Sequence, residues 1–283
     1  MEMEIEMKAD LHIHSNFSDS SRTIEEIVSI AKSKNIGLIS VCDHASIDAY
    51  DSLLIECNKA NINCILGVEL CAGWNNKWSH VLAYNFDKNN NDMKALIDGQ
   101  YSDIECEYIV YNMSLDYPQM SLEDYRNFDY PKDKGGWKYL YYATAMGAAS
   151  SYEEANLTIF PKYSKPNHLS GIGDCSLEDF CSIVKRANGV PVLAHPIYIY
   201  DRYGADNFIT CLNEVLECGI GGIECYYPSH SKELTYICVD FCKKNDLRIT
   251  GGSDCHGEFD KSEGFSLGEF DISIDMLDLK GLI

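Results

Sequence analysis

The stretch Asp10-Leu11-His12-Ile13-His14-Ser15 ends the first apolar run of the chain and determines how the rest is interpreted. His12 and His14 are two residues apart, so on a strand their side chains face the same way and can bind one ion. A second acid–imidazole pair, Asp254 and His256, stands where one of the last apolar runs ends. Six of the eight histidines lie at the ends of predicted strands, which neither core packing nor random surface placement would give. The sequence therefore predicts a metal site assembled from the whole length of the chain.

The composition limits the kind of protein to which this site belongs. At 283 residues and 46% hydrophobic content, the chain can form one large α/β domain or a domain with an insertion. The N-terminus, residues 1–8, lacks the pattern of a signal peptide, and no apolar run approaches the length of a membrane span. We therefore expect a cytoplasmic protein without a membrane partner.

Charge and cysteine content narrow the possibilities further. The net charge of −21 argues against a basic groove for duplex nucleic acid, whereas a small anionic substrate is compatible if metals supply local positive charge. Thirteen cysteines are an odd number, and no pair has CxxC spacing, which argues against a disulfide framework and against a thiolate zinc site.

Short apolar runs alternate with helical patterns along most of the chain. Thr23-Ile24-Glu25-Glu26 has the form of a capping box and predicts a helix that stops at Asn35-Ile36-Gly37. We expect further helices over 52–60, 177–187, 208–217 and 234–244, and strands over 38–42, 64–68, 80–84, 190–194, 220–225 and 248–250. This alternation predicts a parallel sheet, open or closed into a barrel.

Residues 89–173 break the alternation. They are rich in Tyr, Asp, Lys and Asn, carry a turn-forming segment at 131–136, and show a helix-like pattern over 137–149 but no clear apolar strand. The sequence therefore predicts one domain from residues 1–88 and 174–283, with 89–173 as an inserted, mostly helical subdomain.

The polar residues at strand ends suggest a site for more than one ion. Asp254 could complete the ligands of the ion held by His12 and His14. Glu69 follows a continuous apolar run, and its two carboxylate oxygens can bridge two cations in a way that an imidazole cannot. A second ion is assigned to His80 and His195, and a third to Asp19, His44 and His256. Nitrogen and oxygen ligands without thiolates predict two or three divalent ions, which we expect to be Zn, Mn or Fe.

Each of these groups also has a simpler interpretation. A pair of strand histidines can hydrogen-bond at a barrel rim, and Asp43-His44 can be a helix cap beside a satisfied imidazole. Glu69 can be a surface carboxylate, although a lone charge at the end of a five-residue apolar run is costly unless it is paired. Taken together and in these topological places, the groups favour the metal site.

Together these residues form a pattern that resembles the PHP (polymerase and histidinol phosphatase) domain of metal-dependent phosphoesterases, over residues 9–88 and 177–257. The resemblance rests on Asp10-Leu11-His12-Ile13-His14-Ser15, Ser18-Asp19, Cys42-Asp43-His44, Gly67-Val68-Glu69, His80, Ala194-His195-Pro196, Ile223-Glu224 and Ser253-Asp254-Cys255-His256. It is strongest for the stand-alone nucleotide-phosphatase-like branch. It implies a distorted seven-stranded (β/α) barrel and a phosphoric ester hydrolase with two or three metal ions. Where the family usually has SDG and TDH, this chain has Ser20 and Cys42 in place of Gly and Thr, and neither change removes an expected ligand.

The expected reaction is hydrolysis of a small phosphomonoester, a nucleotide or a related phosphate, by a hydroxide that bridges two metal ions. His230 and Asp43 are the candidates for the general acid or for orienting a ligand. Arg202 and His230 are candidates for substrate binding, and Glu224 for an outer carboxylate that orients a histidine. His230 and Arg202 can equally be exposed loop residues.

Three other functions stay open at this point. They are a histidinol-phosphate-type phosphatase, an amidohydrolase-like enzyme acting on carbon–nitrogen bonds, and a non-catalytic metal-binding module. The natural substrate, the native metal and the oligomeric state are not determined by the sequence.

Overall fold

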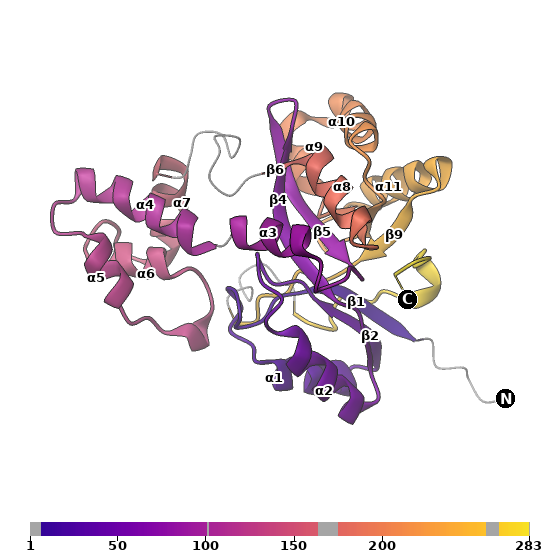
Figure 1. The fold of residues 1–283 in the computed structure, drawn as a ribbon, viewed down its shortest axis with the longest axis horizontal. Helices are drawn as coiled ribbons and strands as arrows, with labels where there is room; N and C mark the ends of the chain where they lie inside the picture. The colour runs from indigo at the N-terminus through magenta and orange to yellow at the C-terminus, as the bar shows by residue number, and fades with distance from the viewer. Residues whose placement is uncertain (1–6, 101, 164–174, 259–265, 283) are drawn as a thin grey trace.

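The computed structural model describes residues 7–100, 102–163, 175–258 and 266–282. Two regions are visible: a large α/β unit, called the main unit below, and a helical lobe beside it (Figure 1). Within the described residues, no helix combines the length and the hydropathy that a membrane span requires. None of the thirteen cysteines forms a disulfide.

The first sheet of the main unit has three parallel strands, β1 (Lys8–Ile13), β2 (Ile36–Val41) and β3 (Asn63–Cys64). Helices α1 (Ile24–Ser33) and α2 (Tyr50–Ala60) connect and cover these strands (Figure 1). The predicted capping box is confirmed, because Thr23 Oγ1 accepts from Glu26 N–H and the Glu26 carboxylate accepts from Thr23 N–H. The capped and buried helix α1 begins after Thr23, and this start fixes the end of the preceding loop, which carries Asp19.

The second sheet has the order β6-β4-β5-β7-β8-β9. The strands are β4 (Gly67–Trp74), β5 (Lys77–Tyr84), β6 (Cys175–Ser176), β7 (Val190–Leu193), β8 (Gly222–Tyr226) and β9 (Arg248–Gly251). Helices α3 (Asn91–Gly99), α8 (Leu177–Arg186), α10 (Ala205–Glu217) and α11 (Lys232–Asn245) accompany it, with the short α9 (Ile197–Tyr203) after β7. Their apolar faces and the sheet form the largest hydrophobic core.

The prediction of a parallel sheet is wrong for one strand. β5 runs antiparallel to both β4 and β7. Asn75 and Asn76, both with positive φ (45° and 59°), form the two-residue connection from β4 to β5, as a type I′ hairpin turn requires. β5 is therefore longer than the strand expected over 80–84, and the strand expected over 64–68 is divided between the end of β3 and the start of β4, which belong to different sheets.

A closed seven-stranded barrel is not detected in the described part of the chain. The two sheets are instead joined by single bridges, His44 with Glu69 and Ile13 with Cys255. The connecting hydrogen bonds run from Glu69 N–H to the carbonyl of Asp43 and from Asp254 N–H to the carbonyl of His12. Regular pairing stops at these seams, which are the places where the polar strand-end residues lie.

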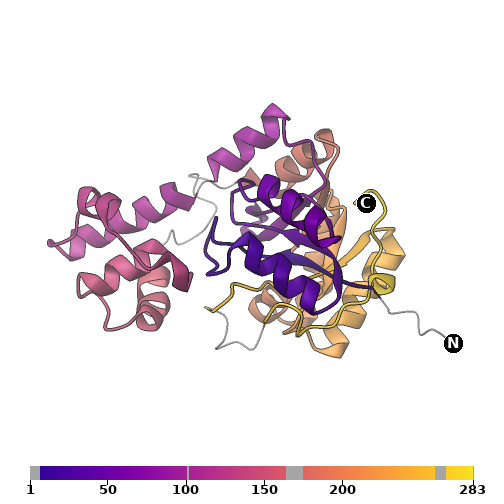
Figure 2. The same cartoon turned by 90° about the horizontal axis from the view of Figure 1, so that it is seen from below.

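The lobe contains α4 (Ser102–Asp116), α5 (Leu122–Asn127), α6 (Lys138–Ala145) and α7 (Tyr152–Tyr163), with the 3₁₀ turn η1 (Lys132–Lys134). It has a separate tyrosine-rich core, which includes Tyr139, Leu140 and Tyr142. Figure 2 shows it standing apart from the sheets. The expected insertion, residues 89–173, also includes α3, but Met93 of that helix packs into the core of the main unit.

Both ends of the lobe connect to the main unit at the same place. Before the lobe, the Gln100 side chain accepts from the N–H of Cys71 on β4 (2.7 Å) and donates to its carbonyl (2.8 Å). After the lobe, Cys175 pairs with Ala72, the next residue of β4. The chain therefore leaves and re-enters the main unit at neighbouring positions of one strand.

Candidate metal centre

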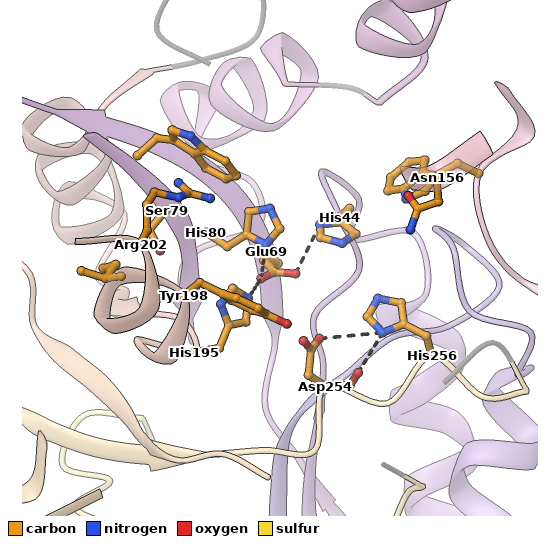
Figure 3. A pocket seen from close by; sticks show the side chains of 13 residues that line it. His44, Glu69, Ser79, His80, Asn156, His195, Tyr198, Arg202, Asp254 and His256 are labelled. Atoms are coloured by element: carbon orange, nitrogen blue, oxygen red, sulfur yellow. Dashed lines mark hydrogen bonds and ion pairs between the residues drawn. The ribbon is translucent and has the colours of Figure 1, made fainter. Parts of the chain in front are cut away.

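The structure brings the nine residues expected to bind metal into one place, where the two sheets meet. Figure 3 shows those that also line the cavity: His44, Glu69, His80, His195, Asp254 and His256. His12 lies on β1, Glu69 on β4 and His80 on β5. The others follow strand ends or lie in the loop after β1: His14, Asp19, His44, His195, Asp254 and His256. Five are buried, and His44, His80, Asp254 and His256 are half-buried at the mouth of the site. This convergence agrees with the rule that the carboxyl ends of parallel strands carry the functional groups.

Glu69 is the central residue of the cluster, and its two oxygens face different imidazoles. Oε1 is 3.0 Å from Nε2 of His195 and 3.0 Å from Nδ1 of His80. Oε2 is 3.2 Å from Nε2 of His14, 3.2 Å from Nδ1 of His44 and 3.4 Å from Nε2 of His12. One carboxylate therefore contacts ligands of more than one candidate ion position.

Three groups of side chains have donor atoms that lie within 4.8 Å of one another. The Asp254 group is His12, His14, Glu69 and Asp254; the His80 group is His44, Glu69 and His80; the Asp19 group is His14, Asp19, His44 and His256. In the Asp19 group, Asp19 Oδ2 is 3.4 Å from Nε2 of His256 and 3.8 Å from Nε2 of His44. Neighbouring groups share residues, so ions bound in them would be neighbours as well.

The residues fit divalent metal ions. Two ligand atoms that are each about 2.1 Å from one ion lie roughly 3.0 to 3.4 Å apart, and most of the separations around Glu69 fall in that range. Nε2 of His12 and Nε2 of His14 face each other at 3.2 Å. Buried Nδ1 of His14 and Oδ1 of Asp254 have no hydrogen-bond partner among the described residues, which is unusual for buried polar atoms. The donors are nitrogen and oxygen only, which suits Zn, Mn or Fe.

Neighbouring imidazoles keep the carboxylates of the cluster ionised although they are buried. Burial alone would raise the pKa of Glu69, but the imidazoles of His80 and His44 outweigh it and hold that pKa well below its usual range. The pKa values of Asp19 and Asp254 are lowered as well, since neighbouring imidazoles again outweigh the effect of burial. These carboxylates are therefore present as anions, the form that binds metal.

The backbone is also unusual at the ligand positions. His195 and Asp254 both have positive φ, 25° and 54°, a region that residues other than glycine seldom adopt. Such conformations persist where the surrounding structure fixes them, and they cluster at functional sites.

Side chains outside the cluster orient the candidate ligands. Glu224 on β8 is fully buried; its Oε1 is 3.1 Å from Nδ1 of His12, and its Oε2 accepts from the N–H of His195 (2.7 Å). Nε2 of His12 is thereby directed at the centre of the site. The Tyr227 hydroxyl donates to Oδ2 of Asp254 (3.1 Å), which leaves Oδ1 facing His12 and His14. The sequence did not single out Tyr227; its position after the strand that carries Glu224 was the available signal.

Asp43 and His230 lie away from the centre of the cluster. Both oxygens of Asp43 accept hydrogen bonds from the loop after β1, from Ser15 and Ser18. Nδ1 of His230 is 3.0 Å from the carbonyl of Cys225, and His230 does not line the cavity described below. Asp43 therefore orders the loop that carries Asp19, and a role for either residue as general acid stays a prediction.

A cavity of about 490 Å³ opens above the cluster (Figure 3). Its wall on the main unit includes Trp78 on β5, together with Tyr198 and Arg202 on α9. The Arg202 guanidinium lies 4.5 Å from the centre of the Trp78 ring. Among the described residues that line the cavity, Arg202 is the only lysine or arginine, and with the described residues it forms no ion pair or hydrogen bond. Arg202 is therefore free to bind an anion.

The lobe supplies the opposite wall of the cavity. Trp137, which precedes α6, lies with its ring centre 5.6 Å from that of His44, and Asn156 on α7 lines the same space. Sequence reasoning missed both residues. No local pattern marks them, because they reach the cavity only through the packing of the lobe beside the main unit.

Comparison with known proteins gives a family for this arrangement. The family model described as "PHP domain" matches residues 10–164, more than half of the chain. Over 260 residues the chain is 24% identical to phosphoribosyl 1,2-cyclic phosphate 1,2-diphosphodiesterase of Eggerthella lenta, covering 89% of this chain and 95% of that protein. It is 34% identical to a 5'-3' exoribonuclease of Haemophilus influenzae, but over 93 residues only, which is 33% of this chain and 34% of that enzyme.

Two solved structures share the fold over nearly the whole chain. A Bifidobacterium adolescentis protein described as a metal-dependent phosphoesterase superposes with a TM-score of 0.76 at 22% identity, covering 95% of this chain and 94% of that one. An amidohydrolase of Chromobacterium violaceum, solved with bound sulfate and no metal, gives a TM-score of 0.70 at 20% identity, covering 88% of each chain. At these identities the likeness concerns the fold alone.

Proposed function

This chain belongs to the PHP domain family, and we propose that it is a metal-dependent phosphoesterase that hydrolyses a small phosphomonoester, a nucleotide or a related phosphate. The observation that carries the proposal is the position of Glu69, whose two oxygens contact imidazoles of different candidate ion positions. Neighbouring cations held on either side of such a carboxylate would stabilise the attacking and the leaving oxygen of a phosphoryl transfer to water.

Divalent ions bound by these residues would supply a nucleophile at neutral pH and neutralise the charge of the phosphoryl oxygens. The chain's own contribution is to place those ions and the substrate. Glu224 and Tyr227 orient His12 and Asp254, and the Arg202 guanidinium, held over Trp78, would bind an anionic group of the substrate. The organic part of the substrate would extend between Tyr198 and the lobe wall.

A phosphodiester is the second candidate substrate, and one observation favours it. The Eggerthella lenta relative, which matches over most of both chains, is named as hydrolysing a cyclic phosphodiester. The cavity is open enough for either type of ester, and a P–O ester bond is cleaved in both, so the two candidates differ in whether the product is inorganic phosphate or a phosphomonoester.

A hydrolysis screen with metal analysis tests the proposal. The purified chain is loaded with Mn, Zn or Fe and assayed with nucleotides, sugar phosphates, amino-alcohol phosphates, cyclic phosphodiesters, short single-stranded RNA and simple amides. We expect release of phosphate from a monoester, with two or three ions per chain. Hydrolysis of amides alone, or full metal content without any hydrolysis, would contradict the proposal and would favour an amidohydrolase or a binding module.

The substrate role of Arg202 is tested in the same assay. Arg202→Ala should raise KM for the preferred ester about 10-fold, since a charge-assisted hydrogen bond contributes roughly 1.5 to 3 kcal/mol, and it should leave the metal content unchanged. Arg126→Ala is the matched control, because Arg126 pairs with Glu107 on the surface of the lobe and is remote from the cavity. An unchanged KM for Arg202→Ala would remove Arg202 from the substrate site.

A further inference from the structure

We propose that the lobe is a positioning element for the Asp19 group: its segment Gly135-Gly136-Trp137 holds Asp19 in place, so that binding of an ion by this group depends on docking of the lobe. The inference rests on the proposed metal-dependent function and concerns a role for the lobe beyond lining the cavity. Four observations support it: a backbone contact, the fit of two glycines, the anchoring of the segment within the lobe, and the anchoring of the Asp19 loop.

The contact is a hydrogen bond between the two backbones. Gly136 N–H donates to the carbonyl of Asp19 at 2.6 Å. The carboxylate of that same residue lies among His14, His44 and His256. A segment of the lobe therefore touches the metal centre through the residue that supplies a candidate ligand.

The two glycines allow this close approach. Gly135 and Gly136 have φ of +72° and +81°, which side-chain-bearing residues rarely adopt. A Cβ added at Gly135 would lie 2.8 Å from the Asp19 carbonyl oxygen and 2.9 Å from Ser21 N. Both are backbone atoms, so a larger residue at Gly135 would push the lobe and the Asp19 loop apart.

The segment is anchored within the lobe. The hydroxyl of Tyr152 on α7 accepts from Trp137 N–H (2.9 Å), and the Tyr141 hydroxyl donates to the Gly135 carbonyl (3.0 Å). The Trp137 ring then lies beside His44, a second member of the Asp19 group. The position of the segment is thus set by α6 and α7, and a shift of either helix would reach Asp19.

On the main unit, the loop around Asp19 is held at both sides. Ser18 Oγ donates to Asp43, and Ser21 N–H donates to the carbonyl of His256. Between these two anchors, the Asp19–Ser20 peptide makes two hydrogen bonds: its carbonyl accepts from Gly136 of the lobe, and its N–H donates to the Ser15 carbonyl (3.1 Å). Loss of the Gly136 contact removes one of the two bonds that orient this peptide and loosens the attached carboxylate, whereas the Asp254 and His80 groups receive no backbone contact from this segment.

The test compares two glycine variants of the lobe at similar positive φ; because Gly135 also has ψ of −173°, a conformation essentially limited to glycine, Tyr152→Phe is added as a variant without that strain. Gly135→Ala disturbs the contact, and Gly147→Ala is the matched control, because Gly147 lies in the same lobe at φ +77° with no atom within 4 Å of an added Cβ. Ions per chain are measured by elemental analysis after equilibration with limiting Mn or Zn, and affinities by calorimetric titration of the metal-free full chain.

We expect Gly135→Ala to bind one ion fewer than wild type, or to bind its weakest ion at least about 10-fold less tightly, as outer contacts of metal ligands usually contribute. Gly147→Ala should match wild type, and Asp19→Asn should reproduce Gly135→Ala. Tyr152→Phe, which keeps the ring and removes the acceptor for Trp137 N–H, should weaken the same ion by a smaller factor. Tyr152→Phe also tests the inference if Gly135→Ala does not fold.

Equal ion number and affinity in wild type, Gly135→Ala and Tyr152→Phe would overturn the inference. An equal loss in Gly135→Ala and Gly147→Ala would do the same, because it would point to general strain in the lobe. The result is independent of the proposed reaction, since metal binding is measured without substrate. A chain that binds its ions as expected but hydrolyses no phosphoester would leave this inference standing and remove the proposed function.

Discussion

The main unit and the lobe face the same cavity, but they line it with different chemistry. The main unit contributes all nine candidate metal ligands and Arg202, which lie on strands, in the segments that follow strands, or on the short helix α9. The lobe contributes an indole and an amide, Trp137 and Asn156, from a separate hydrophobic core. With the proposed function, this difference predicts that the main unit carries out the reaction, and that the lobe contacts the organic part of the substrate and supports one edge of the metal centre.

The largest effect is expected from loss of a candidate metal ligand of the main unit. His14→Ala removes an imidazole shared by the Asp254 and Asp19 groups, so metal and activity should be lost together, activity by at least about 1000-fold. Far-UV circular dichroism should stay close to wild type. Normal metal content with retained turnover would show that the cluster is not the catalytic centre. His230→Ala is an informative companion, because His230 lies outside the cavity and its loss should leave the metal content unchanged.

A change in the lobe core should separate the two regions. Leu140 is fully buried in the core of the lobe, so Leu140→Ala should destabilise the lobe by about 2 to 5 kcal/mol. Because the main unit has its own cores, we expect the lobe to become sensitive to proteolysis first, while the ions of the Asp254 group are retained. Limited proteolysis with elemental analysis measures both. A single cooperative loss of structure and of all the metal would show that the regions fold as one unit.

A conservative change in the main unit should weaken the metal centre without breaking the fold. Glu224→Gln keeps the size of the side chain but removes the negative charge beside His12. The affinity for metal should fall about 10-fold to 100-fold, the range found for outer partners of metal-binding histidines. Calorimetric titration measures it, with Glu214→Gln on α10 as the control, because Glu214 is half-buried and paired with Lys77 but does not line the cavity. An unchanged affinity would mean that Glu224 serves packing only.

The smallest effect concerns pH and a buried thiol of the main unit. Burial raises the pKa of Cys181 on α8 from its ordinary value of 9.0 to about 12. The native state therefore keeps this proton between pH 9 and 12, while the unfolded state loses it. The contribution of Cys181 to stability is full below pH 9 and falls as pH rises toward 12, by up to about 1.4 kcal/mol per pH unit. Cys181→Ala should lose stability less steeply over this range in denaturant titrations, and an identical slope would contradict the assignment.

Much of the metal centre was predictable because strand ends are visible in the sequence. Apolar runs located most of the strands, and polar residues that follow strands, such as His14 and His195, marked the edge where the chain converges. Glu69 also ended an apolar run, but it lies within β4 and not at a strand end. The outer role expected for Glu224 agrees with its contacts to His12 and His195, although its importance for function is untested.

The direction of strand β5 and the docking of the lobe were not predictable from the sequence. Periodicity shows that β5 is a strand but not that it runs antiparallel, and the Asn75-Asn76 turn that reverses the chain was not recognised as a hairpin signal. Closure of the barrel was expected from the resemblance alone. Trp137 acquires its position only when the lobe packs, so nothing in its local sequence could assign it to the cavity.

The way in which the lobe is connected to the main unit affects which insertions can replace it during evolution. Gln100 contacts Cys71 and Cys175 pairs with Ala72, so the chain leaves the main unit and returns to it at adjacent residues of β4. Because the ends of an inserted segment need only meet across this small gap, a shorter, longer or unrelated segment could replace it at little conformational cost. Selectivity for new substrates could therefore evolve by replacement of the lobe with another segment, while the ion-binding residues of the main unit stay unaltered.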